Sequence, residues 1–123
     1  MAQRMKNGSK MESFRQGHLY WYDPGETTGS EIKKIRPCLI LTSDTISRFM
    51  DVVTVVPLTS SQKLWPTRVH FKHVGRDSYI ACDQIRSTDK SRMLGYIREL
   101  PIDVYKEVTK TLDDNFSLNK AEK

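Results

Sequence analysis

The stretch Glu31-Ile-Lys-Lys-Ile-Arg-Pro-Cys-Leu-Ile-Leu41 takes the chain from a charged loop into a continuously apolar strand. Pro37 has no backbone N–H and a fixed φ, so it suits the first residue of a strand. Its ring also pushes the preceding residue, Arg36, into an extended conformation. The sequence therefore predicts that Arg36 is held at a stiff loop-to-strand junction. There its permanently charged, fork-shaped guanidinium matches the geometry of a phosphate.

The loop before this junction, residues 23–35, is long for a compact domain, which is typical of a functional or a disordered segment. Three basic residues close the loop, namely Lys33, Lys34 and Arg36. They form either a phosphate-contact patch or a solvated face. Taken alone, the local pattern slightly favours a surface Arg36 in an ion pair with Glu26 or Glu31.

The chain of 123 residues is long enough for one domain with a real core. It contains 37% hydrophobic and 28% charged residues, which is typical of a soluble globular protein. We expect a single domain over residues 16–118, a disordered leader over residues 1–15 and a polar tail over residues 119–123. The net charge of +5 and the pI of about 9.3 are compatible with a polyanionic partner such as RNA or DNA.

Cys38 and Cys82 lie far apart in apolar runs without C-x-x-C spacing, so we expect two buried thiols in a reducing, cytoplasmic setting. His18, His70 and His73 are scattered, and we expect structural or surface roles for them. No group of His, Cys, Asp and Glu has the spacing of metal ligands, so neither a metal nor another cofactor is expected. No apolar run has the length of a membrane span.

Short β-rich segments between turn signals predict a mainly β fold, a small and strongly curved sheet or barrel with one C-terminal helix. The expected strands cover residues 18–22, 37–42, 51–58, 67–72, 78–82 with a continuation to 86, and 95–100. We expect short helical segments over 43–48 and 89–93 and a turn over 75–77. A helix begins at Pro101, because apolar residues then recur at three- and four-residue spacing at Ile102, Tyr105, Val108, Leu112 and Phe116.

The run Val52-Val53-Thr54-Val55-Val56 is β-branched without alternation, which predicts a strand covered on both faces. Thr59 and Ser60 follow this strand and bring hydroxyls to its rigid end, although both residue types are also common in turns. Farther along, Gln84 and Arg86 share one face of the fifth strand by the two-residue period. That face either contacts RNA or is simply exposed to solvent.

Several short motifs occur in one order: Gly17, Gly29-Ser30-Glu31, Arg36-Pro37, Val56-Pro57-Leu58-Thr59-Ser60, and Asp83-Gln84-Ile85-Arg86 followed by Asp89. With this order and spacing, from about residue 16 to residue 116, the chain resembles the MazF/PemK/Kid family of toxin endoribonucleases. The resemblance implies an SH3-like barrel, a homodimer, and cleavage of single-stranded RNA, including mRNA, at short sequences. It also implies an antitoxin partner whose acidic tail occupies the RNA site.

The resemblance assigns catalytic roles to a cation, two hydroxyls and a base, which are Arg36, Thr59, Ser60 and Asp83. With the basic loop included, the expected RNA-binding residues are Lys33, Lys34, Gln84 and Arg86. Some members carry His where this chain has Ser30, and Arg where it has Ala81. The resemblance therefore favours the version of the mechanism that uses Arg36 and Thr59.

RNA is cut without metal when its own 2′-OH attacks the adjacent phosphorus, which leaves a 2′,3′-cyclic phosphate and a 5′-OH. Arg36 would stabilise the extra charge, usually the largest catalytic term, and Thr59 would hydrogen-bond the phosphate or the 2′-OH. Two other classes stay open, a nucleic-acid-binding module without cleavage and a gyrase-poisoning toxin on the same fold. Neither needs a cation aimed at a hydroxyl, so the Arg36/Thr59 pair speaks against both.

Overall fold

The computed structural model describes residues 14–25 and 34–118. The strands are β2 (His18–Tyr22), β3 (Arg36–Ile40), β4 (Val52–Thr59), β5 (Arg68–His73), β6 (Arg76–Ala81), β7 (Arg86–Asp89) and β8 (Met93–Glu99). The α-helices and 3₁₀ turns are α1 (Asp44–Ser47), η1 (Cys82–Gln84), η2 (Lys90–Arg92) and α2 (Ile102–Phe116). The expectations for Glu26, Ser30, Glu31, Lys33 and the tail fall outside the described residues.

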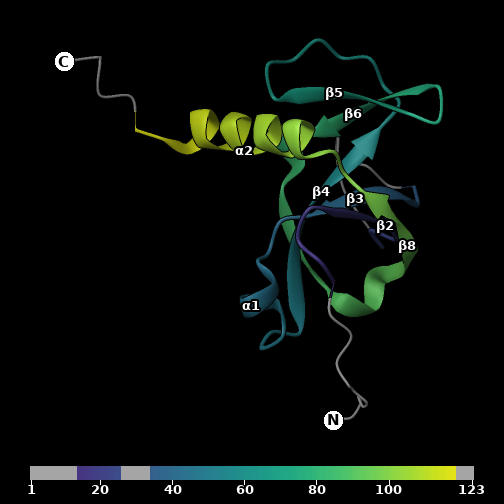
Figure 1. Cartoon of the computed structure of the whole chain (residues 1–123), viewed down its shortest axis with the longest axis vertical. Helices are drawn as coiled ribbons and strands as arrows, with labels where there is room; N and C mark the ends of the chain where they lie inside the picture. The colour runs from purple at the N-terminus through teal and green to yellow at the C-terminus, as the bar shows by residue number, and fades with distance from the viewer. Residues whose placement is uncertain (1–13, 26–33, 119–123) are drawn as a thin grey trace.

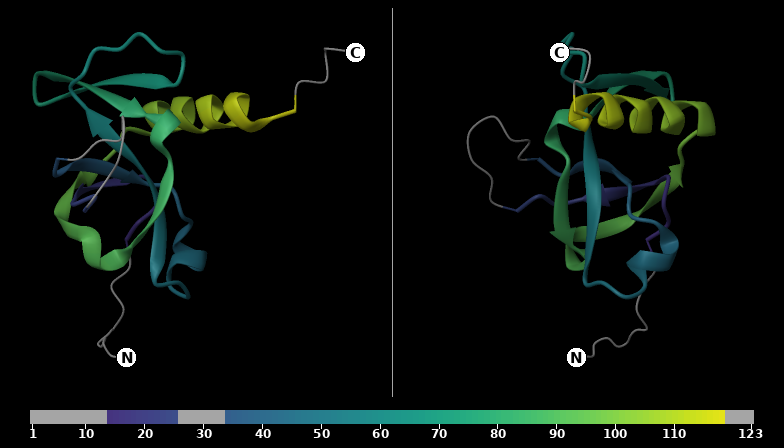
Figure 2. Two further views of the ribbon diagram at one scale, coloured as in Figure 1. Left: turned by 180° about the vertical axis from the view of Figure 1, so that it is seen from behind. Right: turned by 90° about the vertical axis from the view of Figure 1, so that its left-hand side faces the viewer.

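The strands form one curled antiparallel sheet in the order β5-β6-β4-β3-β2-β8, and β7 also pairs with β4 (Figure 1). β4 serves three partners, because β3 and β7 flank its earlier part and β6 pairs with its last two residues. α2 lies across the end of the curl beside the β5–β6 hairpin, and α1 lies at the opposite end (Figure 2). The predicted fold, a small curved β-sheet with a C-terminal helix, is confirmed.

β4 is covered on both faces, as its unbroken β-branched run predicts. Val53 and Val55 face one core while Val56 and Leu58 face the other, and none of these side chains is more than 3% exposed. A one-residue slip would exchange the two faces, so burial on both sides fixes the register of β4. The position of Thr59 at the end of this strand is therefore rigid.

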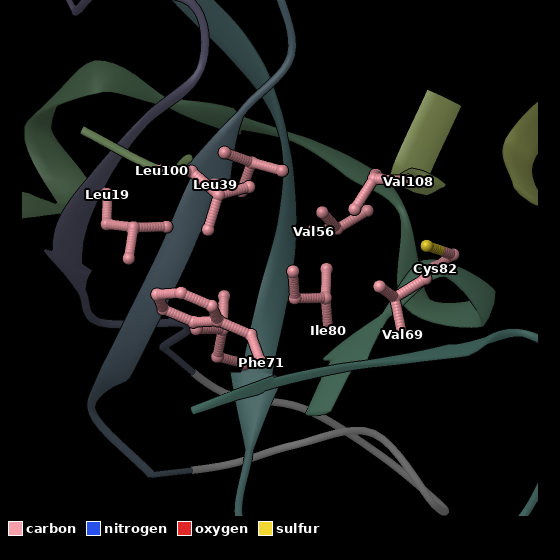
Figure 3. Close-up of a cluster of buried hydrophobic side chains, with 10 residues drawn as sticks. Leu19, Leu39, Val56, Val69, Phe71, Ile80, Cys82, Leu100 and Val108 are labelled. Carbon is pink, nitrogen blue, oxygen red and sulfur yellow. The ribbon is translucent and has the colours of Figure 1, made fainter. Parts of the chain in front are cut away.

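Two hydrophobic cores lie on opposite faces of the sheet. The first core, beneath α2, contains Leu19, Leu39, Val56, Leu58, Val69, Phe71, Ile80, Cys82, Leu100 and Val108 (Figure 3). The second core contains Phe14, Tyr20, Tyr22, Cys38, Ile40, Val53 and Val55. Each core holds one of the two free cysteines, and burial raises the pKa of both thiols, that of Cys82 to about 12. The expectation of two buried thiols is confirmed.

The folded chain begins before the expected boundary at residue 16. Phe14 is 6% exposed and packs edge-to-face on Tyr20, with 5.1 Å between the ring centroids. The backbone N–H of Arg15 donates to the Tyr20 hydroxyl at 3.2 Å. Phe14 and Arg15 thus belong to the domain, because the Phe14 ring fills one end of the second core.

The turn expected over residues 75–77 lies earlier, at Val74-Gly75, and Arg76 and Asp77 belong to β6. His73 pairs with Arg76, so only two residues connect the strands, and both have positive φ, 50° and 74°. This is the type I′ geometry, whose twist matches that of a two-stranded hairpin. The predicted position of the turn was wrong because Val74 is β-branched, and a β-branched residue rarely adopts positive φ.

The fifth strand does not continue to residue 86. It ends at Ala81, turns through η1, and resumes as β7 against β4. The helical segment expected over 89–93 is the 3₁₀ turn η2, where the Asp89 carboxylate accepts from the Ser91 N–H at 2.8 Å. Gln84 in η1 and Arg86 in β7 therefore do not share one strand face.

α2 begins one residue later than expected. Pro101 is its N-cap, with φ −55° and ψ 141°, and its carbonyl accepts from the N–H groups of Val104 and Tyr105. Asp103 lies in the first turn, where a carboxylate complements the helix dipole. Among the described residues, no helix combines the length and the apolar character needed to cross a membrane.

Candidate active site

Three polar side chains form a row across the second-core face of the sheet. Tyr22 in β2 is the register partner of Arg36 in β3. Cys38 in β3 pairs with Pro57 in β4 as the last pair of that ladder, and Arg36 and Thr59 each lie two residues beyond it, on the same side of their strands as Cys38 and Pro57. Directly opposed residues point to the same face, with Cβ atoms about 4.5–5.5 Å apart. We call Tyr22, Arg36 and Thr59 the polar row.

Two hydrogen-bond donors of the polar row are buried without a partner. Tyr22 is 2% exposed, Thr59 is 5% exposed and Arg36 is half-buried. In the described part of the chain, neither the Tyr22 hydroxyl nor the Arg36 Nε finds a hydrogen-bond partner. Such groups are rare, because each costs roughly 1–3 kcal/mol. Two of them on adjacent strands indicate a site built for an external acceptor.

Thr59 is the last residue of β4, one residue beyond the expected strand end, and Ser60 begins the irregular segment 60–65. The Thr59 hydroxyl oxygen accepts from the backbone N–H of Ser61 at 3.1 Å. This bond orients the Thr59 side chain and leaves its O–H available as a donor. Ser60 is exposed at the first position beyond the strand.

The surroundings of Tyr22 are cationic. Burial raises the pKa of the Tyr22 phenol, so the phenol is a neutral O–H donor at neutral pH. The charges of Arg86 and Arg92 and the neighbouring Thr88 side chain oppose this rise, although no atom meets hydrogen-bond geometry with the hydroxyl. Arg86 is the register partner of Val55, which places it on the same face as the polar row.

Arg92 packs against the start of the loop that precedes Arg36. A Cβ added at Gly25 would meet the Arg92 guanidinium, which would have to shift, and the φ of 72° favours glycine at this position. The backbone N–H of Asp23 donates to the Arg92 carbonyl at 3.0 Å, and the Gly25 N–H donates to the Asp23 carboxylate at 2.9 Å. These contacts fix Arg92 near the end of β2, where Tyr22 lies.

Asp83, which we expected to act as a base, forms an ion pair with Arg68. Its carboxylate accepts from Arg68 Nε at 2.7 Å and Nη2 at 3.1 Å, and from the Thr67 hydroxyl at 2.9 Å. Burial alone would raise the pKa of Asp83, but these hydrogen bonds hold it below its ordinary value. The carboxylate is therefore held in its charged form beside η1, and its role as a base stays a prediction that the Asp83→Asn variant tests.

The expected RNA-binding residues are distributed unevenly. Arg86 lies on the face of the polar row, and Lys34 is exposed two residues before Arg36. Gln84 lies in η1, and Lys33 is outside the described residues. Over residues 14–25 and 34–118, no three His, Cys, Asp or Glu side chains come close enough to hold a metal ion.

Sequence reasoning missed Tyr22 and Arg92. An aromatic strand gives no sign of which tyrosine packs and which one faces a site. The available signal is the position of Tyr22 immediately before Asp23-Pro24-Gly25, where a strand gives way to the loop that leads to Arg36. Arg92 gives no local signal, since only the fold brings it to Gly25.

A curled antiparallel half-barrel with one covering helix, and a guanidinium between two hydroxyls, define a small basic β protein equipped to bind an anion such as a phosphodiester. The comparison with known families agrees with this class. The chain belongs to the family described as PemK-like, MazF-like toxin of type II toxin-antitoxin system, which it matches over residues 15–116.

Named relatives cover nearly the whole chain. Endoribonuclease MazF of Staphylococcus saprophyticus is 31% identical over 111 residues, which are 85% of this chain and 92% of the relative. The crystal structure of MazF (Form-I) from Deinococcus radiodurans matches with a TM-score of 0.78 at 28% identity, covering 87% of this chain and 99% of that chain. MazE-MazF (Form-II) from the same organism matches with a TM-score of 0.72 at 28% identity, covering 88% and 99%. The predicted family is confirmed.

Proposed function

We propose that this protein is a sequence-specific endoribonuclease that cleaves single-stranded RNA, including mRNA, and acts as the toxin of a toxin-antitoxin pair. The observation that carries the proposal is the polar row, in which a half-buried guanidinium lies between two hydroxyls on adjacent strands. The family match and the relative named Endoribonuclease MazF support the same activity.

The substrate supplies the nucleophile. The 2′-OH attacks the adjacent phosphorus, the bond to the 5′ oxygen breaks, and the products carry a 2′,3′-cyclic phosphate and a 5′-OH. Arg36, central in the row, stabilises the charge that develops on the phosphate oxygens. Thr59 hydrogen-bonds and orients the 2′-OH, and the exposed Ser60 bonds the phosphate beside it. This reaction requires no metal, because the row provides the positive charge.

The RNA backbone follows the basic groups around the row. Arg86 shares the face of the row and Lys34 is exposed beside Arg36, so both neutralise neighbouring phosphates. Lys33 and Gln84 are proposed to extend these contacts. Phosphate contacts supply affinity without sequence information, so the bases are read by other contacts.

We also propose a homodimer with RNA lying across both subunits, and an acidic antitoxin that covers the RNA site. Large side chains stay exposed on β2 and β8, among them Trp21, Leu94 and Tyr96, and a two-fold interface is the commonest way to bury such surface. A light-scattering mass of 14.3 kDa at micromolar protein would contradict the dimer.

The test compares one RNA oligonucleotide with a variant that has a single 2′-deoxy sugar on the 5′ side of the scissile phosphate, both in EDTA. Mapping cuts along a long RNA first supplies the sequence. The deoxy variant should bind, because phosphate contacts remain, but it should not be cut. Cleavage of the deoxy variant, or a 5′-phosphate on the products, would show that water is the nucleophile.

Two variants of one residue separate chemistry from packing. Thr59→Val keeps the shape of the side chain and removes its hydroxyl, whereas Thr59→Ser keeps the hydroxyl. We expect the valine variant to lose cleavage and the serine variant to retain most of it. RNA that stays intact with wild-type protein, while still binding it, would instead favour a nucleic-acid-binding module.

A further inference from the structure

We propose that Tyr22 is a catalytic residue whose hydroxyl protonates the 5′ oxygen that leaves when the RNA backbone is cut. The inference rests on the proposed function and deepens it, because Arg36 and Thr59 leave the reaction without a proton donor. Three observations carry it: the place of Tyr22 in the polar row, the lack of a partner for its hydroxyl, and the guanidinium groups around it.

The order of the polar row matches the geometry of an in-line displacement. In such a reaction the attacking and leaving oxygens lie on opposite sides of the phosphorus, with the other oxygens between them. Tyr22 pairs with Arg36 on the neighbouring strand, about 4.7–4.9 Å away, and Thr59 lies on the far side of Arg36, two residues beyond the last pair that joins β3 to β4. With Thr59 at the 2′-OH and Arg36 at the central oxygens, Tyr22 stands on the side of the leaving oxygen. A phosphate that reaches the half-buried Arg36 lies one strand away from the phenol.

Among the described residues, no well-formed hydrogen bond holds the Tyr22 hydroxyl, although the Thr88 side chain lies beside it. The hydroxyl is buried and finds no hydrogen-bond partner in the described part of the chain. The hydroxyl of Tyr20, two residues earlier on the same face, accepts from the Arg15 N–H at 3.2 Å. A phenylalanine at position 22 would fill the same space in the second core without desolvating a hydroxyl. Packing therefore accounts for the ring of Tyr22 but not for its oxygen.

The atoms of the step balance without any further reactant. As the 2′ oxygen bonds to phosphorus and releases its proton to water, the bond from phosphorus to the 5′ oxygen breaks. The phenol proton passes to that oxygen, which becomes the 5′-OH. Arg86 and Arg92 stabilise the phenolate that remains, and water returns a proton to it. Transfer in this direction is favourable, because an alkoxide is a stronger base than a phenolate.

The test uses a substrate that needs no proton donor. In RNA with sulfur in place of the bridging 5′ oxygen, the leaving thiolate departs without protonation. Tyr22→Phe should slow cleavage of ordinary RNA by about 100-fold or more, the usual size of a general-acid effect. It should cleave the sulfur-bridged RNA at close to the wild-type rate. Arg36→Ala should be slow on both substrates, because charge stabilisation is needed in either case.

Tyr20→Phe is the matched control, since it removes a hydroxyl from the same strand face but one that bonds the backbone. The ratio of its cleavage rates on ordinary and sulfur-bridged RNA should equal that of the wild-type protein. Tyr22→Phe should also resist urea at least as well as wild type, because it removes an unpaired buried hydroxyl. Equal slowing of Tyr22→Phe on both substrates, or no slowing on ordinary RNA, overturns the assignment. A wild-type protein that cuts neither RNA overturns the proposed function itself.

Discussion

Arg36 has a rigid backbone position and a side-chain Nε without a hydrogen-bond partner among the described residues. It opens β3 directly before Pro37, its Nε is buried without a partner in the described part of the chain, and its register partner is Tyr22. Among the described residues, its Nε therefore adds no hydrogen bond to the stability of the fold. Its positive charge is instead available to an anion that reaches the strand end.

We accordingly expect Arg36→Ala to lower the cleavage rate by about 100-fold or more, as loss of one charge-stabilising donor does. The fold should be unchanged, which circular dichroism and urea unfolding can check. Arg76→Ala is the control, because Arg76 is exposed on β6 outside the polar row. Full activity in a folded Arg36→Ala protein would contradict the role of Arg36.

Single residues were predictable where the cause is local. The Arg36-Pro37 junction and the hydroxyl of Thr59 at a strand end both follow from neighbours in the sequence. The partner of Asp83 does not, because Arg68 lies fifteen positions away and reaches it only through the β5–β6 pairing. The role of Tyr22 could not be predicted for a similar reason, since the other residues of the polar row lie on other strands.

At the scale of elements, the ion pair between Arg68 and Asp83 holds β5 to η1. The Arg68 side chain is 4% exposed, so a neutral partner would leave a buried guanidinium poorly paired. Asp83→Asn should therefore reduce the free energy of unfolding by roughly 1.5–3 kcal/mol near pH 7. Cleavage per folded molecule should stay within a few-fold of wild type. A stable but inactive Asp83→Asn protein would instead make Asp83 the base.

The pH dependence of this loss has a definite sign. The pKa of Asp83 is lowered in the folded protein, so its stabilisation is present above the ordinary carboxyl pKa of about 3.9 and is lost as the pH falls through the lowered value. Urea unfolding of wild type and Asp83→Asn should therefore converge at low pH. Asp77→Asn is the comparison: the His70 hydrogen bond also lowers the pKa of Asp77, but that carboxylate is 45% exposed, so its pH-dependent contribution should be smaller.

The β5–β6 turn carries strain that a substitution can remove. Val74 is 81% exposed and has a φ of 50°, which costs a residue with a Cβ roughly 1–2 kcal/mol. Asparagine tolerates this conformation and is favoured in type I′ turns. Val74→Asn should raise the free energy of unfolding by about 1 kcal/mol, whereas Val74→Ala should raise it little. An unchanged urea midpoint for Val74→Asn would mean that the turn is not strained.

The positions of β4 and α2 were predictable from the sequence, because the pattern of buried residues determines them. The break between β6 and β7 was not predictable in this way. The backbone N–H of Cys82 donates to the Thr67 carbonyl at 3.0 Å, a contact set by the position of a distant strand. Local periodicity continues smoothly through residues 78–86, so only the closed sheet shows where the chain turns.

At the scale of the whole molecule, the net charge of +5 and the arginines around the polar row favour an acidic partner on the proposed RNA site. A disordered acidic segment that folds on this surface would compete directly with RNA. We expect the cognate antitoxin to displace labelled 2′-deoxy RNA in an anisotropy titration, and added salt should weaken both complexes.

Arg86→Ala is the informative variant in that titration. Arg86 lies on the face of the polar row, so its loss should weaken RNA and antitoxin binding together. Arg76→Ala, on the exposed β6, should change neither. If the inhibited complex bound RNA as tightly as the free protein does, the antitoxin would act away from the polar row, and direct competition would be wrong.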